Sequence, residues 1–138
     1  AVANPRVGAG QKALVSHLLE AVGRVAWVED EALIDAVTAV SGSGPAYVFY
    51  MVECLAEAAR SLGLPPELAD DLARATIEGA GELLYRSDLP PDQLRRNVTS
   101  PGGTTAAALA VLMDGDGLAG LMTRAVAAAR KRSVELSG

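Results

Sequence analysis

Aromatic side chains are scarce in this chain: they make up 4% of its 138 residues, although half of the residues are hydrophobic. The apolar mass is therefore mainly Ala, Val and Leu, a composition that favours closely packed helices. Positive charge is also in deficit, because the formal net charge is −5. A protein that neutralises phosphates needs a basic face, so nucleic acid is not expected as a partner. The single cysteine excludes an internal disulfide framework and fits a reducing compartment.

Long apolar runs are missing as well. No uninterrupted apolar stretch approaches the roughly 20 residues that span a bilayer, so no membrane association is expected. The opening residues, AVANPRVGAG, lack both an initiator Met and the charged and apolar regions of a signal peptide. We therefore expect a soluble, cytoplasmic, mostly helical protein that is a piece of something longer.

Proline and glycine divide most of the chain into helices joined by short connections. Pro45 lies in the first turn of one segment, where its missing N–H costs little, and Gly63 ends that segment. Helices are expected over residues 9–23, 29–40, 44–63, 65–88, 90–98, 104–114 and 117–136. Short connections favour neighbouring helices that pack against each other, so the prediction is a mainly α fold.

Residues 1–30 follow a different pattern. The stretches AVAN and RVAWV are prone to form short strands, and an amphipathic helix lies between them. Leu14, Leu18 and Val22 share one face of that helix. A short strand–helix–strand segment is therefore expected before the purely helical region.

The segment AYVFYMVECLAEAA is too apolar for an ordinary surface helix. Its polar positions are essentially Glu53 and Glu57, which leaves most of its circumference non-polar. A chain of this length has few places to bury such a helix, and an exposed apolar patch usually marks an interface. We expect an obligate oligomer, most simply a two-fold dimer. The alternative is a compact monomer with one central helix.

The stretch NVTSPGGTTAAALAVL, residues 97–112, places a polar loop directly at the start of an alanine-rich helix. Pro101 fixes one φ angle, and Gly102 and Gly103 permit conformations that other residues avoid. The first N–H groups of a helix have no internal acceptor, and the helix dipole is positive at that end, so the site is suited to an anion. The Gly-Lys-Ser/Thr ending of a phosphate-binding loop is absent, so a small carboxylate is the expected ligand.

The alternative for this loop is a simple helix cap, with Ser or Thr as the N-cap residue. Two glycines and four hydroxyl groups exceed what a cap requires. The hydroxyl groups are those of Thr99, Ser100, Thr104 and Thr105.

Other motifs are better explained as structure. Residues 8–13 fit the loose dinucleotide fingerprint, but the preceding AVANPRV supplies an Asn and a Pro instead of a buried strand. The DGDG of residues 114–117 lacks the third acidic ligand and the closing Glu of a calcium loop, so a turn is expected. His17 has no metal-ligand partner and no nucleophile at useful spacing. No metal site and no catalytic triad are therefore expected.

The stretches SGSGPAY and VTSPGGTT occur in an order and spacing that resemble the C-terminal portion of pyrroline-5-carboxylate reductase. The similarity runs from about residue 24 to the end of the chain. This family reduces 1-pyrroline-5-carboxylate to L-proline with NADPH or NADH. Hydride attacks the C5 carbon of a protonated imine, which is already an electrophile, so positioning is sufficient and no nucleophilic side chain is required.

The resemblance implies site residues in and around the loop. Backbone N–H groups from Ser100 to Thr105 and the Ser100 hydroxyl would hold the substrate carboxylate, and Thr105 would also face the ring nitrogen. Asn97 matches a position that touches the nicotinamide cofactor, and Glu31 matches an acidic position on the substrate side. The substrate-binding set is thus Glu31, Ser100, Gly102, Gly103, Thr104 and Thr105, with Thr105 as the catalytic residue.

The resemblance also implies a domain organisation. Residues 1–29 would be the end of an N-terminal Rossmann domain that binds NAD(P)H, and residues 30–138 would be a helical dimerisation and substrate-binding domain. The family forms an interlocked homodimer, often assembled into a decamer of five dimers. Because the glycine-rich nucleotide motif is absent, activity of this chain alone is not expected. The rival hypothesis is a non-catalytic helical oligomerisation module in which the loop is only a cap.

Overall fold

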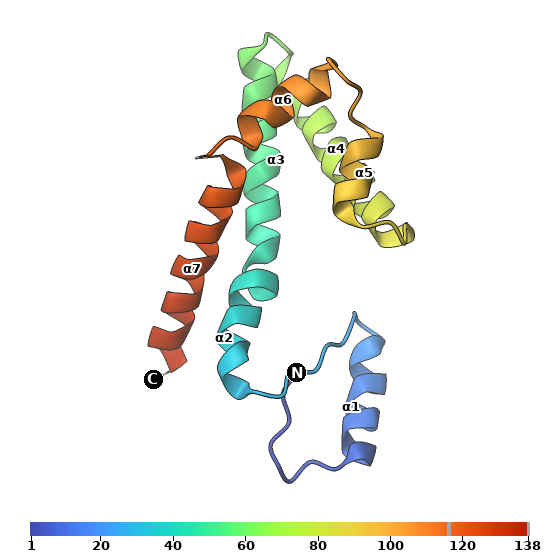
Figure 1. Ribbon diagram of the computed structural model, residues 1–138, viewed down its shortest axis with the longest axis vertical. Helices are drawn as coiled ribbons and strands as arrows, with labels where there is room; N and C mark the ends of the chain where they lie inside the picture. Colours follow the sequence, from blue (N-terminus) through green and yellow to red (C-terminus); the bar gives the residue numbers. More distant parts are fainter. Residues whose placement is uncertain (116, 138) are drawn as a thin grey trace. The chain divides into compact units, whose positions relative to one another are not determined.

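The computed structural model describes residues 1–115 and 117–137, and the predicted mainly α fold is confirmed (Figure 1). The helices are α1 (Ala9–Glu20), α2 (Ile34–Val37), α3 (Gly44–Ser61), α4 (Pro66–Arg86), α5 (Pro91–Asn97), α6 (Thr104–Leu112) and α7 (Leu118–Ser137). A 3₁₀ turn, η1 (Glu31–Leu33), precedes α2, and a π-helical turn, η2 (Thr38–Gly42), follows it. The turn expected over DGDG includes Asp116, which lies outside the described residues.

The chain divides into two compact units. The first combines Ala1–Ser43 with Ala125–Gly138, and the second is Gly44–Arg124. Residues of α7 therefore belong to both units. The predicted boundary between residues 29 and 30 concerns a different division and stays a prediction.

In the first unit, the two expected strands are reduced to a single parallel bridge between Val2 and Val28. The N–H of Val28 donates to the carbonyl of Ala1 at 2.9 Å. Helix α1 lies between these two segments in the sequence. The indole Nε1 of Trp27 donates a hydrogen bond to Ser16 Oγ of this helix at 2.9 Å. The arrangement is the smallest form of a parallel strand pair joined through a helix.

The helix expected over residues 29–40 is divided into η1, α2 and η2, and this is a correction. Asp30 begins it as a cap, since its carboxylate accepts from the N–H of Ala32 at 2.9 Å. At the other end the N–H of Ser43 donates to the carbonyl of Thr38 at 2.9 Å, which is the i to i+5 bond of a π turn. Sequence periodicity alone does not distinguish such a turn from an α-helix.

In the second unit, α3 and α4 form an antiparallel pair (Figure 1). The connection after α3 contains Gly63, whose φ of +92° is the left-handed conformation that ends many helices. The N–H groups of Gly63 and Leu64 donate to Arg60 and Ala59, respectively, and this satisfies the last carbonyls of α3. Pro66 then opens α4 at a position where proline costs no hydrogen bond.

The pair is packed through small side chains. Ala56 of α3 and Ala69 and Ala73 of α4 are buried, and Ala39 of η2 is the other buried residue among those described. Alanine allows two helix backbones to approach closely, but each methyl group removes little apolar surface from water.

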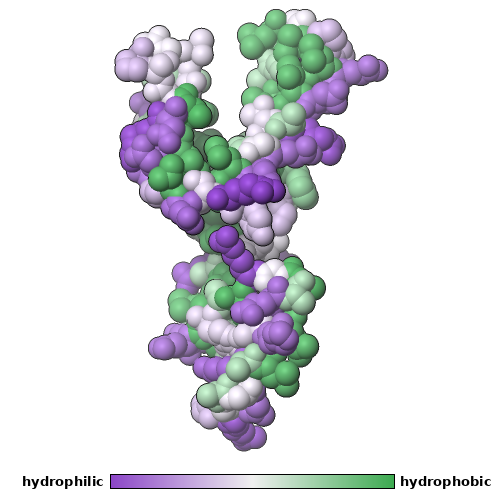
Figure 2. Space-filling view, turned by 90° about the vertical axis from the view of Figure 1, so that its right-hand side faces the viewer, coloured by the Kyte–Doolittle hydropathy of each residue, from purple (hydrophilic) through white to green (hydrophobic). Residues whose placement is uncertain are grey.

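Large apolar side chains are left exposed in both units. Within residues 1–115 and 117–137 no large side chain is fully buried, and Phe49 of α3, for example, is 65% exposed. Figure 2 shows hydrophobic residues spread over the visible surface among hydrophilic ones. The accessible surface is 10646 Å². A compact monomer of this mass would expose about 6,700 Å², and two separately compact units would together expose about 8,100 Å². The excess, about 2,500 Å², indicates surface that a partner covers.

Candidate functional site

The loop before α6 is a tight turn from Ser100 to Gly103. The N–H of Gly103 donates to the carbonyl of Ser100 at 3.1 Å, and between these residues Gly102 has a φ of +70°. Proline in the second position and a left-handed glycine in the third are the features of a type II turn. The sequence therefore determines this turn locally, through Pro101 and Gly102.

Gly103 is required for a second reason. A Cβ atom at this position would lie 2.3 Å from the Ser100 hydroxyl oxygen and 3.2 Å from the Ser100 carbonyl oxygen. The hydroxyl group of Ser100 thus stands directly over the Gly103 backbone. Of the two glycines, Gly102 provides the left-handed conformation and Gly103 provides the space for this hydroxyl.

The backbone donors at the start of α6 are available for a ligand. Gly103 is the N-cap residue, and no side chain caps the helix. The first intrahelical bond runs from the N–H of Ala107 to the carbonyl of Gly103. Within the described part of the chain, no hydrogen bond engages the N–H groups of Thr104, Thr105 and Ala106. The simple-cap alternative, with Ser or Thr at the N-cap, is therefore wrong.

The two threonines differ in exposure. Thr104 is exposed, whereas Thr105 and Ala106 are partly buried. The free N–H groups and the Ser100 hydroxyl group thus come from one continuous segment, residues 100–106. Such a segment can bind an anion with two oxygen atoms, because several donors and the positive helix end act together.

Asn97 ends α5, directly before the loop. Its Oδ1 accepts from Gln93 Nε2 at 2.8 Å, which leaves its amide N–H groups as donors on an exposed side chain. Thr99 is held back towards α5, since its hydroxyl donates to the carbonyl of Arg95 at 2.6 Å. Arg96 forms an ion pair with Asp92 within α5, with 2.7 Å between Nη1 and Oδ2. Asn97 is therefore a candidate donor from α5 to a ligand.

Glu31 is the remaining predicted residue. It is exposed at the start of η1, in the unit formed by Ala1–Ser43 and Ala125–Gly138, whereas the loop lies in Gly44–Arg124. The assignment of Glu31 to the substrate side stays a prediction.

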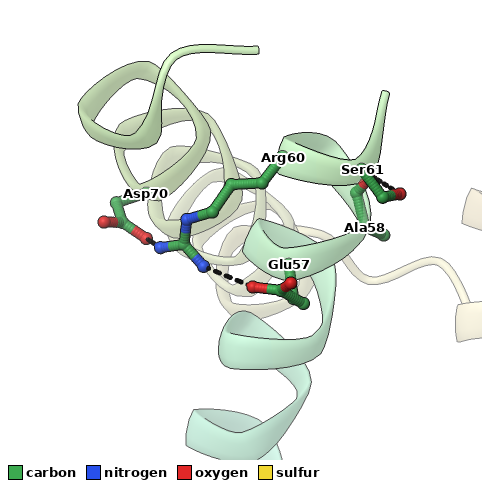
Figure 3. A network of polar contacts seen from close by, with 5 residues as sticks. All are labelled: Glu57, Ala58, Arg60, Ser61 and Asp70. Atoms are coloured by element: carbon green, nitrogen blue, oxygen red, sulfur yellow. Dashed lines mark hydrogen bonds and ion pairs between the residues drawn. The ribbon is translucent and has the colours of Figure 1, made fainter. Parts of the chain in front are cut away.

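A second polar feature, which the sequence did not reveal, lies beside α3 and α4. Arg60 of α3 contacts Glu57 on its own helix at 3.0 Å and also contacts Asp70 of α4 (Figure 3). The hydrogen bonds to Glu57 and then to Asp70 raise the pKa of Arg60 above its ordinary value. The spacing of Glu57 and Arg60 on one helix is readable from sequence, but the partner on α4 depends on the turn at Gly63.

These residues border an open pocket of about 670 Å³ along α3. Tyr50 and Cys54 line it further along the same helix, and a hydrogen bond to the Cys54 thiol raises the pKa of Tyr50. The groups around Arg60 satisfy one another, so the cluster joins α3 to α4 and does not offer a free cation to a ligand.

In residues 1–115 and 117–137, no three His, Cys, Asp or Glu side chains are grouped so that they could hold a metal ion. None of the described helices combines the length and the apolar character that crossing a bilayer requires.

Comparison with known proteins gives matches over nearly the whole chain. A family model described as pyrroline-5-carboxylate reductase dimerisation matches residues 31–136. A pyrroline-5-carboxylate reductase of Pseudomonas aeruginosa is 46% identical over 98% of this chain and 49% of its own length. That of Arabidopsis thaliana is 48% identical over 91% of this chain and 45% of its own length.

Solved structures agree with these matches. The pyrroline-5-carboxylate reductase of Coxiella burnetii has a TM-score of 0.91 and 44% identity, over 98% of this chain and 50% of that one. The pyrroline carboxylate reductase of Plasmodium falciparum with NADP bound has a TM-score of 0.80 and 35% identity, over 98% of this chain and 51% of that one. The chain spans about half the length of the curated relatives it matches.

Proposed function

Because the chain belongs to the pyrroline-5-carboxylate reductase dimerisation family, we propose that it forms the helical half of a reductase that converts 1-pyrroline-5-carboxylate to L-proline. NADPH or NADH supplies the hydride in this reaction. The proposal is supported by identities of 46% and 48% to relatives that bear this name. No metal takes part in it.

The proposed domain organisation agrees with the finding that the chain spans about half the length of its relatives. Residues 1–29 are the end of a Rossmann nucleotide-binding domain, and residues 30–138 are the dimerisation and substrate-binding domain. The parallel bridge between Val2 and Val28, with α1 between its two partners, supports the first assignment. The start of the family match at residue 31 supports the second.

The observation that carries the proposed site is the set of unengaged N–H groups at the start of α6. A substrate carboxylate accepts hydrogen bonds from Thr104, Thr105 and Ala106, where the helix dipole is positive. The Ser100 hydroxyl group adds a donor above Gly103. A carboxylate fits better than a phosphate, because no lysine or arginine occurs between residues 97 and 112.

With the carboxylate fixed, the imine ring has a defined position relative to the loop. Hydride adds to C5, the electron pair of the C=N bond moves to the ring nitrogen, and the protonated imine becomes the secondary amine of proline. The Thr105 hydroxyl faces this nitrogen and orients it, and Thr105 is for this reason the proposed catalytic residue. Asn97 donates towards the cofactor side, and Glu31 lies on the substrate side.

The proposed assembly is a homodimer, with five dimers as the higher state that the family resemblance implies. The excess of accessible surface supports it, because covering about 2,500 Å² on each of two copies amounts to about 5,000 Å² in all. Obligate homodimers commonly bury interfaces of this size. Ser100, Pro101, Gly102 and Thr104 of the loop are exposed, so in this proposal a second subunit and the nucleotide-binding half enclose the substrate.

The experiment that tests the activity is a reductase assay of the parent protein that carries both halves. We expect oxidation of NADPH or NADH that depends on 1-pyrroline-5-carboxylate, with L-proline as the product. If the protein forms the dimer but produces no proline with either cofactor, the non-catalytic oligomerisation module becomes the better account.

A further inference from the structure

A hydrogen bond joins two residues that are 98 positions apart in the sequence. The hydroxyl of Ser133, in α7, donates to Asp35 Oδ1, in α2, at 2.6 Å. Both side chains are partly buried, and both belong to the unit that combines Ala1–Ser43 with Ala125–Gly138. Hydrogen bonds from a hydroxyl group to a carboxylate are short and about twice as strong as neutral ones.

The carboxylate that Ser133 contacts lies one turn before the π-helical turn η2. Asp35 and Ala39 are four residues apart and share a helix face. Ala39 is fully buried, at 0% exposure, although most of its neighbours in η2 are exposed. The face of α2 and η2 that carries the contact with α7 is therefore also the face on which this segment is most tightly packed.

A π turn depends on support from its surroundings. Its i to i+5 bonds are rare, and it occurs mostly as single turns inside α-helices, frequently at functional sites. Here the turn overlaps the SGSG segment, residues 41–44, in which two glycines weaken the local preference for helix. In this segment the N–H of Ser43 donates to Thr38. The contact from Ser133 to Asp35, one turn earlier, is a tertiary contact that supports this segment.

We infer that Ser133 is a positioning residue, which acts through Asp35 to hold the π-helical turn Thr38–Gly42 in place. The C-terminal helix thereby determines the conformation of the SGSG segment, although the two are about ninety residues apart in sequence. The inference does not depend on the proposed activity, because it concerns the stability of one segment of the chain.

The test measures amide hydrogen exchange in the whole chain. Ser133→Ala removes the donor, so we expect the amides of residues 39–43 to exchange about tenfold faster, which corresponds to the net contribution of one hydrogen bond. The amides of α4 should keep their rates, because no contact of α4 changes. Ser133→Thr retains the hydroxyl group and should restore the original rates.

A matched control lies one turn further along α7. The hydroxyl of Ser137 donates to the carbonyl of Ser133 within the same helix, at 2.9 Å. Ser137→Ala therefore removes a serine hydroxyl without touching α2, and residues 39–43 should not respond. Asp35→Asn, which keeps an acceptor but removes its charge, should give an intermediate increase.

The inference is overturned if Ser133→Ala leaves exchange in residues 39–43 unchanged. It is also overturned if Ser137→Ala has the same effect, or if the rates of α4 rise equally, because the change would then be a general loss of stability. None of these results bears on reductase activity, and loss of activity without altered exchange would concern only the proposed function.

Discussion

At the scale of single residues, the two neighbouring glycines of the loop before α6, Gly102 and Gly103, have different structural roles. Gly102 has a positive φ angle. At Gly103, the hydroxyl oxygen of Ser100 lies 2.3 Å from the position that a Cβ atom would occupy. The sequence predicted that these glycines permit conformations that other residues avoid. It did not indicate that the group that approaches Gly103 is the preceding serine, because this contact depends on the turn being closed.

Substitution of Gly103 tests this contact. In Gly103→Ala the new methyl group should displace Ser100 and open the turn, so we expect weaker binding of L-proline to the assembled enzyme, measured by calorimetry. Gly79→Ala is the control, because no atom lies within 4 Å of a Cβ there. In the interior of α4 that change should raise the free energy of unfolding by about 0.5–1 kcal/mol. Equal proline affinity in Gly103→Ala and the wild type would refute the role of the space above Gly103.

Thr105 is the residue whose side chain is proposed to take part in the reaction. Thr105→Ala in the parent enzyme should lower kcat by about 10²-fold, the loss that removal of one well-placed donor produces in favourable cases. The dimer should remain, since the side chain is only partly buried. Thr76→Ala is a matched control, because that hydroxyl donates within α4 to Leu72 at 2.7 Å. Unchanged steady-state kinetics in Thr105→Ala would remove Thr105 from the mechanism.

At the scale of helices, alanine packing and the Arg60 cluster both join α3 to α4, but they contribute unequally. Ala56, Ala69 and Ala73 are buried, whereas the side chains of Glu57 and Asp70 are 75% and 58% exposed. Ion pairs at such exposure contribute little, since water and salt screen them. The close approach of the two helices therefore depends mainly on the small side chains.

This difference can be measured by chemical denaturation. Ala56→Leu should overpack the contact between α3 and α4 and lower the free energy of unfolding by about 1–3 kcal/mol. Arg60→Ala should lower it by much less, and by less still in high salt, because water and salt screen its ion pairs. If Arg60→Ala were the more destabilising change, the ion pairs and not the alanines would be the principal contact.

The helices themselves were largely predictable, because proline and glycine mark their ends. Pro66 opens α4 and Gly63 follows the end of α3, so the predicted and observed limits differ by only a few residues. The subdivision of residues 29–40 was not predictable, since the π turn is a single irregular turn within an apolar pattern. Likewise, neither Arg60–Asp70 nor Asp35–Ser133 could be read from sequence, because each needs elements that only the fold brings together.

At the scale of the whole molecule, the distribution of buried and exposed side chains favours association with a partner. Its buried side chains among the described residues are alanines, while residues such as Phe49, Tyr50 and Leu62 are 65–85% exposed. The apolar character of residues 46–59 predicted an oligomer, and the chain belongs to a family named for dimerisation. Which residues of two copies meet was not predictable, because apolar positions on α3 cover most of its circumference.

Association should therefore determine stability. Light scattering should give twice the chain mass, and the melting temperature should fall on dilution, because partners that bind only the folded state stabilise it by mass action. A monomeric mass together with a melting temperature independent of concentration would contradict the assembly.

The most direct test of the account is a crystal structure of the assembled enzyme with L-proline. The account predicts that the carboxylate oxygens lie within hydrogen-bond distance of the backbone N–H groups of Thr104, Thr105 and Ala106, with the ring nitrogen beside the Thr105 hydroxyl. Proline bound elsewhere, with those three N–H groups facing solvent or another protein group, would contradict it.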